Sequence, residues 1–336
     1  MIDVIGLLGL AVVATAVVWK GSTWLEDSAN RLAAGYGVPA VVQGAIIAAA
    51  GSSMPELVSV LLATLLHGEF ELGVGAIVGS AVFNLLVIPA AAVLAGGGQM
   101  STGRDLVYKE ALFYMLAVAA LLLTFSLAVI YNPLAGAGLQ GAVTRPLALF
   151  PLLLYGLYVF TQYLDTTEHE GSADDTVDLV SAWLWFGLGL VVIIVGVEGL
   201  VRSAIGLGEA FGTPAFLWGM IVVAAGSSVP DAFVSIAAAR SDRPSVSLAN
   251  VLGSNVFDLL VAVPVGVLVA GTLAITFEHI VPMMGFLILA TIVFFTVVRT
   301  EMLLSRQEAW LLLVLYSLFV LWLVAESIGM TNVVPT

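Results

Sequence analysis

The chain has 336 residues, of which 61% are hydrophobic and only 10% are charged. Water-soluble domains are about 45–50% apolar and about 25% charged, so this composition argues against a water-soluble enzyme. The net charge of -13 argues against nucleic acid as a partner. Because cysteine is absent, disulfide bonds and thiolate metal sites are excluded. The composition predicts an integral membrane protein.

Ten apolar runs are long enough for membrane-spanning helices of about 20 residues and too long for barrel strands of about 9–11 residues. The first run lacks the basic segment and cleavage site of a signal peptide, so we expect it to be a true span. The runs lie at residues 2–28, 38–66, 72–96, 107–131, 146–164, 179–204, 213–239, 245–271, 277–298 and 307–328. These runs predict an all-α membrane protein with ten transmembrane helices.

The longest polar connection, residues 164–178, is rich in acidic residues and lies near the middle of the chain. We interpret it as an acidic cytoplasmic linker, with a regulatory cation-binding loop as the alternative. It separates a first five-helix half, residues 1–163, from a second half, residues 179–336.

Three sequence motifs occur once in each half, with the copies 174 or 175 residues apart. The pairs are GSSMPE at 51–56 with GSSVPD at 226–231, GSAVFN at 79–84 with GSNVFD at 253–258, and GVP at 37–39 with GTP at 212–214. A constant spacing is typical of an internal duplication. Because each half has an odd number of spans, the second copy enters the membrane from the opposite side, which predicts two inverted-topology repeats.

Basic residues predict the orientation of the chain, because cytoplasmic connections are enriched in Lys and Arg. Connections that follow the odd-numbered spans hold Lys20, Arg31, Arg104, Lys109, Arg240, Arg243, Arg299 and Arg306, whereas the other side holds Arg145 and Arg202. We therefore expect a multi-pass protein of the cell membrane with both termini extracellular.

Four polar residues, Glu56, Asn84, Asp231 and Asp258, lie deep inside apolar runs with no basic residue near them. A charged side chain there costs about 2.5–3.5 kcal/mol, so the three carboxylates indicate a buried cation or proton site. Oxygen ligands of this kind suit Na⁺, Ca²⁺ or Mg²⁺.

Proline explains how the backbone could contribute to this site. Pro55 and Pro230 cannot donate to the carbonyl groups four residues before them, so we expect helices 2 and 7 to be broken at the Gly-Ser-Ser motifs. Ser80 and Asn84 share a helix face, as do Ser254 and Asp258. Gly75 and Gly79 are interpreted as packing residues. Glu110 and Glu198 are interpreted as interfacial, and the histidines receive no role.

The duplicated motifs resemble the two alpha-repeats of the sodium/calcium exchanger family, within the cation/calcium antiporter superfamily. The resemblance implies a secondary antiporter that exchanges Na⁺ for Ca²⁺ by alternating access, with the first and sixth helices moving against the rest. It implies a central divalent site between Glu56 and Asp231, helped by backbone carbonyl groups near Ser52 and Ser227. The implied Na⁺ ligands are Ser53, Ser80, Asn84, Ser228 and Ser254, while Asp258 assists Na⁺ binding or stays protonated.

Two residues depart from the family pattern: Asp231 replaces the usual Glu, and Ala81 replaces the usual Asn. The shorter Asp231 favours the alternative of an exchanger that transports Mg²⁺ or another divalent cation. A proton-coupled exchanger of the same superfamily is a further alternative. A passive channel and an intramembrane protease that uses Asp231 and Asp258 are weaker alternatives. We expect no enzyme activity and no cofactor, with Na⁺ and Ca²⁺ as substrates, the lipid bilayer as surroundings, and a functional monomer.

Overall fold

The computed structural model describes residues 4–38, 49–101, 103–135, 138–164, 176–241, 244–299, 302–328, 330–331 and 333–334. Helices in the first half of the chain are α1 (Val4–Gly35), α3 (Ala49–Ser52), α4 (Met54–His67), α5 (Phe70–Leu86), α6 (Ile88–Ala95), α7 (Arg104–Tyr131) and α8 (Arg145–Leu164). Those in the second half are α9 (Leu179–Phe211), α10 (Ala215–Trp218), the π-helix η2 (Gly219–Val223), α11 (Ala224–Arg240), α12 (Pro244–Phe257), the π-helix η3 (Asp258–Ala262), α13 (Val263–Ala270), α14 (Phe277–Arg299) and α15 (Arg306–Ser327).

Consecutive helical segments combine into membrane spans. Within the residues just given, nine spans are long and apolar enough to cross a bilayer, and α4 is an apolar helix of 14 residues. Its predicted span also includes residues 39–48, which lie outside the described residues, as do residues 165–175 of the predicted linker. The prediction of an all-helical multi-pass membrane protein is confirmed, with about nine or ten spans where the sequence predicts ten.

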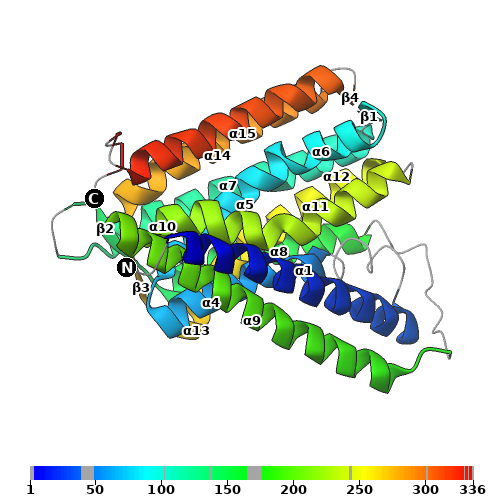
Figure 1. Cartoon of the computed structure of the whole chain (residues 1–336), viewed down its shortest axis with the longest axis horizontal. Helices are drawn as coiled ribbons and strands as arrows, with labels where there is room; N and C mark the ends of the chain where they lie inside the picture. The colour runs from blue at the N-terminus through cyan, green and yellow to red at the C-terminus, as the bar shows by residue number, and fades with distance from the viewer. Residues whose placement is uncertain are drawn as a thin grey trace.

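The long helices α1 and α9 lie side by side along one edge of the molecule, and α14 and α15 lie along the opposite edge (Figure 1). Glycines bring the backbones of α1 and α9 close together. A Cβ atom added to Gly21 would lie 2.8 Å from the backbone nitrogen of Ile193, and one added to Gly196 would lie 2.8 Å from that of Val18. Because later residues of α9 meet earlier residues of α1, the two helices are antiparallel.

Two short antiparallel ladders, which the sequence did not predict, connect the halves. Strand β1 (Gln99–Ser101) pairs with β4 (Leu303–Ser305), and β2 (Gln140–Val143) pairs with β3 (Leu273–Thr276). The two ladders lie at opposite ends of the molecule (Figure 1), which we call the β1–β4 end and the β2–β3 end. Helix α1 begins and α15 ends at the β2–β3 end.

The two Gly-Ser-Ser-x-Pro motifs differ in their local structure. In the first copy the helix is interrupted at Ser53, and Pro55 lies in the first turn of the new helix α4. The second copy does not show the break expected at 226–228, because α11 runs without interruption through Pro230. A helix tolerates an internal proline when neighbouring helices and local π-type turns adjust the backbone, and η2 provides such a turn just before α11.

Candidate functional site

The predicted site residues come from six helical segments that meet inside the molecule. Ser52 ends α3, Ser53 forms the interruption, and Glu56 lies in the first turn of α4. The remaining residues are Ser80 and Asn84 on α5, Ser227, Ser228 and Asp231 on α11, Ser254 on α12, and Asp258 at the start of η3. All ten side chains are at most 2% exposed. The structure therefore brings both motif copies into one buried polar cluster.

Close helix packing makes this cluster compact. A Cβ atom added to Gly79 would lie 2.4 Å from the carbonyl oxygen of Met220, and one added to Gly75 would lie 2.6 Å from that of Phe216. The interpretation of these two glycines as packing residues is confirmed. Helix α5 thus lies against η2 and the start of α11, with Ser80 next to Gly79 in the sequence.

Glu56 is tied to the second motif copy through hydroxyl groups. Its Oε1 accepts hydrogen bonds from Ser228 Oγ at 3.3 Å and Ser80 Oγ at 3.5 Å, and these two hydroxyls lie 2.8 Å apart. Ser227 also lies near this carboxyl group while donating to the carbonyl oxygen of Ala224 at 3.3 Å. The other oxygen of Glu56, Oε2, is buried without a hydrogen-bond partner.

Asp231 occupies the corresponding place in the second copy. Ser52 and Ser254 lie near its carboxyl group, yet neither carboxylate oxygen accepts a hydrogen bond of normal geometry. The two hydroxyls lie 2.9 Å apart, and Ser53 Oγ donates to the carbonyl oxygen of Ser254 at 3.4 Å. Each central carboxylate is therefore surrounded by serines from both halves of the chain.

Asn84 and Asp258 complete the cluster. Asn84 Nδ2 donates to Asn255 Oδ1 at 2.9 Å and to Ser80 Oγ at 3.5 Å, which leaves Asn84 Oδ1 buried and unpartnered. Both carboxylate oxygens of Asp258 are also buried without hydrogen-bond partners, with Ser53 and the other two carboxyl groups nearby. Oxygens without hydrogen-bond donors are the groups that a metal ion or a proton would satisfy.

Within the ranges that the structure describes, the lack of basic partners for the three cluster carboxylates also indicates a cation or proton site. Among the described residues, ion pairs involve Glu71 and Glu198 but none of Glu56, Asp231 and Asp258. Nor do any three acidic or histidine side chains of the described part converge closely enough to hold one metal ion by themselves. A cation bound here would therefore need hydroxyl, amide or backbone oxygens beside the carboxylates, which suits the hard cations Na⁺ and Ca²⁺.

Several polar contacts were missed by sequence reasoning. Asn255 belongs to the second motif, but its hydrogen bonds to Asn84 and to the carbonyl oxygen of Ala81 were not foreseen. Glu198 is not simply interfacial, because both its carboxylate oxygens lie 3.1 Å from His67 Nε2, and Arg202 Nε lies 2.6 Å from Oε1. These pairings depend on how helices pack, and nothing in the sequence pattern indicates them.

Glu110, interpreted from the sequence as interfacial, is buried inside the protein against α8. Its side chain is only 5% exposed, and it accepts hydrogen bonds from Tyr158 Oη at 3.1 Å and Gln162 Nε2 at 2.7 Å. Likewise His279, to which we assigned no role, lies 2.7 Å from a carboxylate oxygen of Glu71. Both contacts connect helices outside the central cluster and contribute to packing.

Comparison with known proteins identifies the family. The family model described as "Sodium/calcium exchanger protein" matches residues 6–164 and 181–325. The chain belongs to the sodium/calcium exchanger family. The two matched segments fall on either side of the acidic linker, and they cover the ten residues of the cluster. The family consists of transporters rather than enzymes.

Similar proteins include bacterial and archaeal membrane proteins. Inner membrane protein YrbG of Escherichia coli is 26% identical over 264 residues, covering 75% of this chain and 76% of the relative. Sodium/calcium exchanger MaX1 of Methanosarcina acetivorans is 25% identical over 283 residues, covering 71% and 76%. The sodium-calcium exchanger NCX_Mj, solved after soaking in 10 mM Na⁺ without Ca²⁺, has the same fold, with a TM-score of 0.64 and 21% identity over 94% of this chain and 98% of that one.

Proposed function

We propose that the chain is a secondary antiporter that exchanges Na⁺ for Ca²⁺ across the cell membrane by alternating access. Glu56 and Asp231 act as the principal Ca²⁺ ligands, with backbone oxygens near Ser52 and Ser227. Na⁺ binds through Ser53, Ser80, Asn84, Ser228 and Ser254, and Asp258 assists it. The match to the sodium/calcium exchanger family model and the fold shared with a sodium-calcium exchanger support this proposal.

One observation carries the proposal. Two carboxylates at corresponding motif positions are buried beside serine hydroxyls, have unpartnered oxygens, and have no ion pair within the described residues. Unpaired buried charge is destabilising, so the arrangement is favourable only when cations or protons neutralise it. Binding Ca²⁺ and Na⁺ in turn at the same cluster would couple their movements.

The proposal treats residues 1–163 and 179–336 as inverted repeats. It is supported by the antiparallel packing of α1 and α9 and by the ladders, since each ladder takes one strand from each half. Discontinuous helices at the middle of the membrane are typical of such transporters, and the interruption at Ser53 is one example. In this scheme α1 and α9 move against the remaining helices, and one chain is sufficient for transport.

A proton-coupled exchanger, or one that carries Mg²⁺ or another divalent cation, is the second candidate. Asp231 favours a divalent cation other than Ca²⁺, because its side chain is one methylene shorter than the usual Glu and reaches less far into the cluster. Mg²⁺ retains several of its waters and needs only one or two carboxylates, whereas Ca²⁺ takes 6–8 oxygen ligands. The identity of the coupling ion distinguishes these functions experimentally.

Transport by purified protein in liposomes tests the proposal. Liposomes loaded with Na⁺ and diluted into Na⁺-free buffer should take up radioactive Ca²⁺, because the outward Na⁺ gradient drives its entry. Glu56→Gln should abolish this uptake while the protein remains folded, because it removes a charge needed for ion binding. Ser126→Ala, a change on α7 outside the cluster, is the control. Uptake driven by a pH gradient alone would contradict Na⁺ coupling and support the second candidate.

A further inference from the structure

A carboxylate outside the ten predicted residues lies beside the first Gly-Ser-Ser motif. Glu26 is on α1, and its side chain is half-buried, with Oε1 shielded from solvent and without a hydrogen-bond partner. It packs against the backbone that leads into the first motif, since a Cβ atom added to Gly51 would lie 3.8 Å from Glu26 Cγ. Gly51 is the residue immediately before Ser52.

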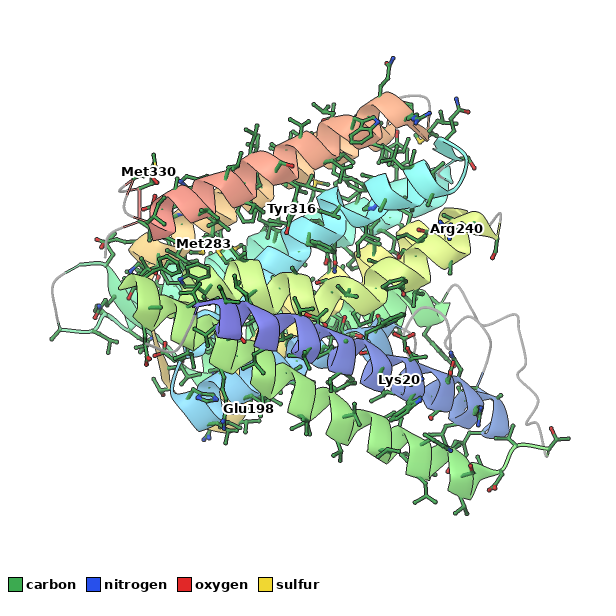
Figure 2. All side chains as sticks on the ribbon, viewed as in Figure 1. Lys20, Glu198, Arg240, Met283, Tyr316 and Met330 are labelled. Atoms are coloured by element: carbon green, nitrogen blue, oxygen red, sulfur yellow. The ribbon has the colours of Figure 1, made fainter. Side chains whose placement is uncertain are left out.

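The position of Glu26 along α1 places it on one side of the central cluster. The ring of Trp19 stacks on that of Phe233 with the centroids 4.4 Å apart, so this point of α1 is level with the part of α11 that holds Asp231. Glu26 lies two helical turns, ~10 Å at about 1.5 Å per residue, beyond Trp19 toward the β1–β4 end. Figure 2 marks Lys20 on this part of α1. Glu26 and Asp231 are like charges on the packed helices α1 and α11.

The corresponding position in the second half carries no acid. At the spacing of 175 residues Glu26 corresponds to Val201, which is fully buried. The local packing supports this correspondence, because Leu25 faces Gly51 as Leu200 faces Gly226. An additional carboxylate is therefore found on the β1–β4 side of the cluster, while the matching position of the other half is apolar.

No basic side chain compensates this charge within the described residues. Glu26 takes part in none of their ion pairs, and the Lys20 ammonium group lies 5.1 Å over the ring of Trp24. Asp231, the cluster carboxylate whose charge acts on Glu26, is 1% exposed with both oxygens unpartnered. A partly desolvated carboxylate without a basic partner attracts a cation.

We propose that Glu26 is a cation ligand on the path between the β1–β4 end and Asp231, where it binds Ca²⁺ or Na⁺ before the ion enters the central cluster and after it leaves. This inference rests on the proposed exchange function and adds a binding position that acts from one side of the membrane only. Because Glu26 lies on α1, movement of that helix would carry the ligand toward or away from Asp231.

Exchange measured with Ca²⁺ added at one membrane face at a time tests this proposal. In membrane vesicles of both orientations, Glu26→Gln should raise the Ca²⁺ concentration for half-maximal exchange about tenfold when Ca²⁺ is added at the β1–β4 face. The value at the opposite face should change little. Glu26→Val, which introduces the residue of the other half, should act in the same direction. Asp27→Asn is the matched control, since it removes the same charge from an exposed neighbour on the same helix.

The outcomes separate the two proposals. Glu26→Gln vesicles that match the wild type at both faces, or that change equally at both, would overturn the role of Glu26 and leave the exchange function intact. Absence of exchange in the wild type would instead contradict the proposed function. In that case Ca²⁺-dependent thermal stabilisation of the purified protein still tests the ligand, because Glu26→Gln should reduce it and Asp27→Asn should not. If Glu26→Gln does not fold, Glu26→Asp serves instead, because it keeps the charge on a shorter side chain. It should raise the Ca²⁺ concentration for half-maximal exchange at the β1–β4 face by a smaller factor.

Discussion

The two central carboxylates differ by one methylene group, and this difference has a direct consequence for ion choice. Asp231→Glu restores the residue usual in the family and extends the second carboxylate toward Glu56. We expect the apparent Ca²⁺ affinity to rise about threefold to tenfold, because Ca²⁺ gains a direct oxygen ligand. Competition between Ca²⁺ and Mg²⁺ in liposome uptake measures the change. A loss of transport would instead indicate a pocket shaped around the shorter side chain.

Asn255 positions another residue of the cluster. It accepts a hydrogen bond from Asn84 Nδ2 and donates to the carbonyl oxygen of Ala81, so the oxygen of Asn84 is left for an ion. Asn255→Ala removes this support, and losing a buried hydrogen bond of this kind costs about 1–3 kcal/mol. We expect weaker apparent Na⁺ affinity with a smaller effect on Ca²⁺, measured from the Na⁺ dependence of Ca²⁺ release. An equal effect on both ions would argue against selective positioning of Asn84.

At the residue scale, the sequence predicted which side chains meet in the cluster. Polar residues such as Glu56 and Asp231 are conspicuous in apolar runs, and their duplication shows that they belong together. Glu26 was missed because it occurs in one half only and lies near a helix end, where an acid is unremarkable. Its importance depends on the packing of α1 against Gly51, which no local pattern encodes. The role of the cluster in ion binding remains a prediction.

At the scale of whole helices, close backbone contact holds the cluster together. Gly79 lets α5 approach Met220 so closely that an added Cβ would lie 2.4 Å from a backbone oxygen, which cannot move away as a flexible side chain can. Gly79→Ala should therefore lower the stability of the protein by about 1–3 kcal/mol through overpacking. Thermal unfolding of the detergent-solubilised protein measures this loss.

A matched control exists on another membrane helix. An added Cβ at Gly187 on α9 would meet nothing within 4 Å, so Gly187→Ala should leave the stability unchanged or raise it by up to ~1 kcal/mol. Equal melting temperatures for the two variants would show that the approach of α5 to η2 tolerates an extra methyl group.

The all-helical architecture and the approximate number of spans could be predicted because apolar runs of sufficient length are unambiguous. The interruptions and π-type turns within these helices could not be predicted. Pro55 accompanies an interruption while Pro230 lies inside a continuous helix, although both occur in nearly identical motifs. The outcome depends on whether the backbone can adjust nearby, as it does in η2, and this adjustment is a property of the packed helices rather than of the motif.

The orientation of the whole molecule is predicted from its basic residues. Cysteine labelling can test it without background, since the chain has no cysteine. Arg240 lies near the β1–β4 end, and Met330 lies near the β2–β3 end (Figure 2). Met330, at 75% exposure, and the exposed Gln99 of β1 are suitable reporters. In intact cells a membrane-impermeant thiol reagent should label Met330→Cys but label Gln99→Cys only after the membrane is opened. The reverse result would place Glu26 on the extracellular side.

The ladders have a consequence for how the protein is made. Gln99 pairs with Ser305, so β1 is synthesised long before its partner strand β4. Until then the backbone groups of β1 stay unpaired. Such long-range pairing slows folding and leaves the edge open to wrong partners. The β1–β4 end therefore closes only when nearly all of the chain has been synthesised, and a truncated product lacking β4 would leave that closure permanently incomplete.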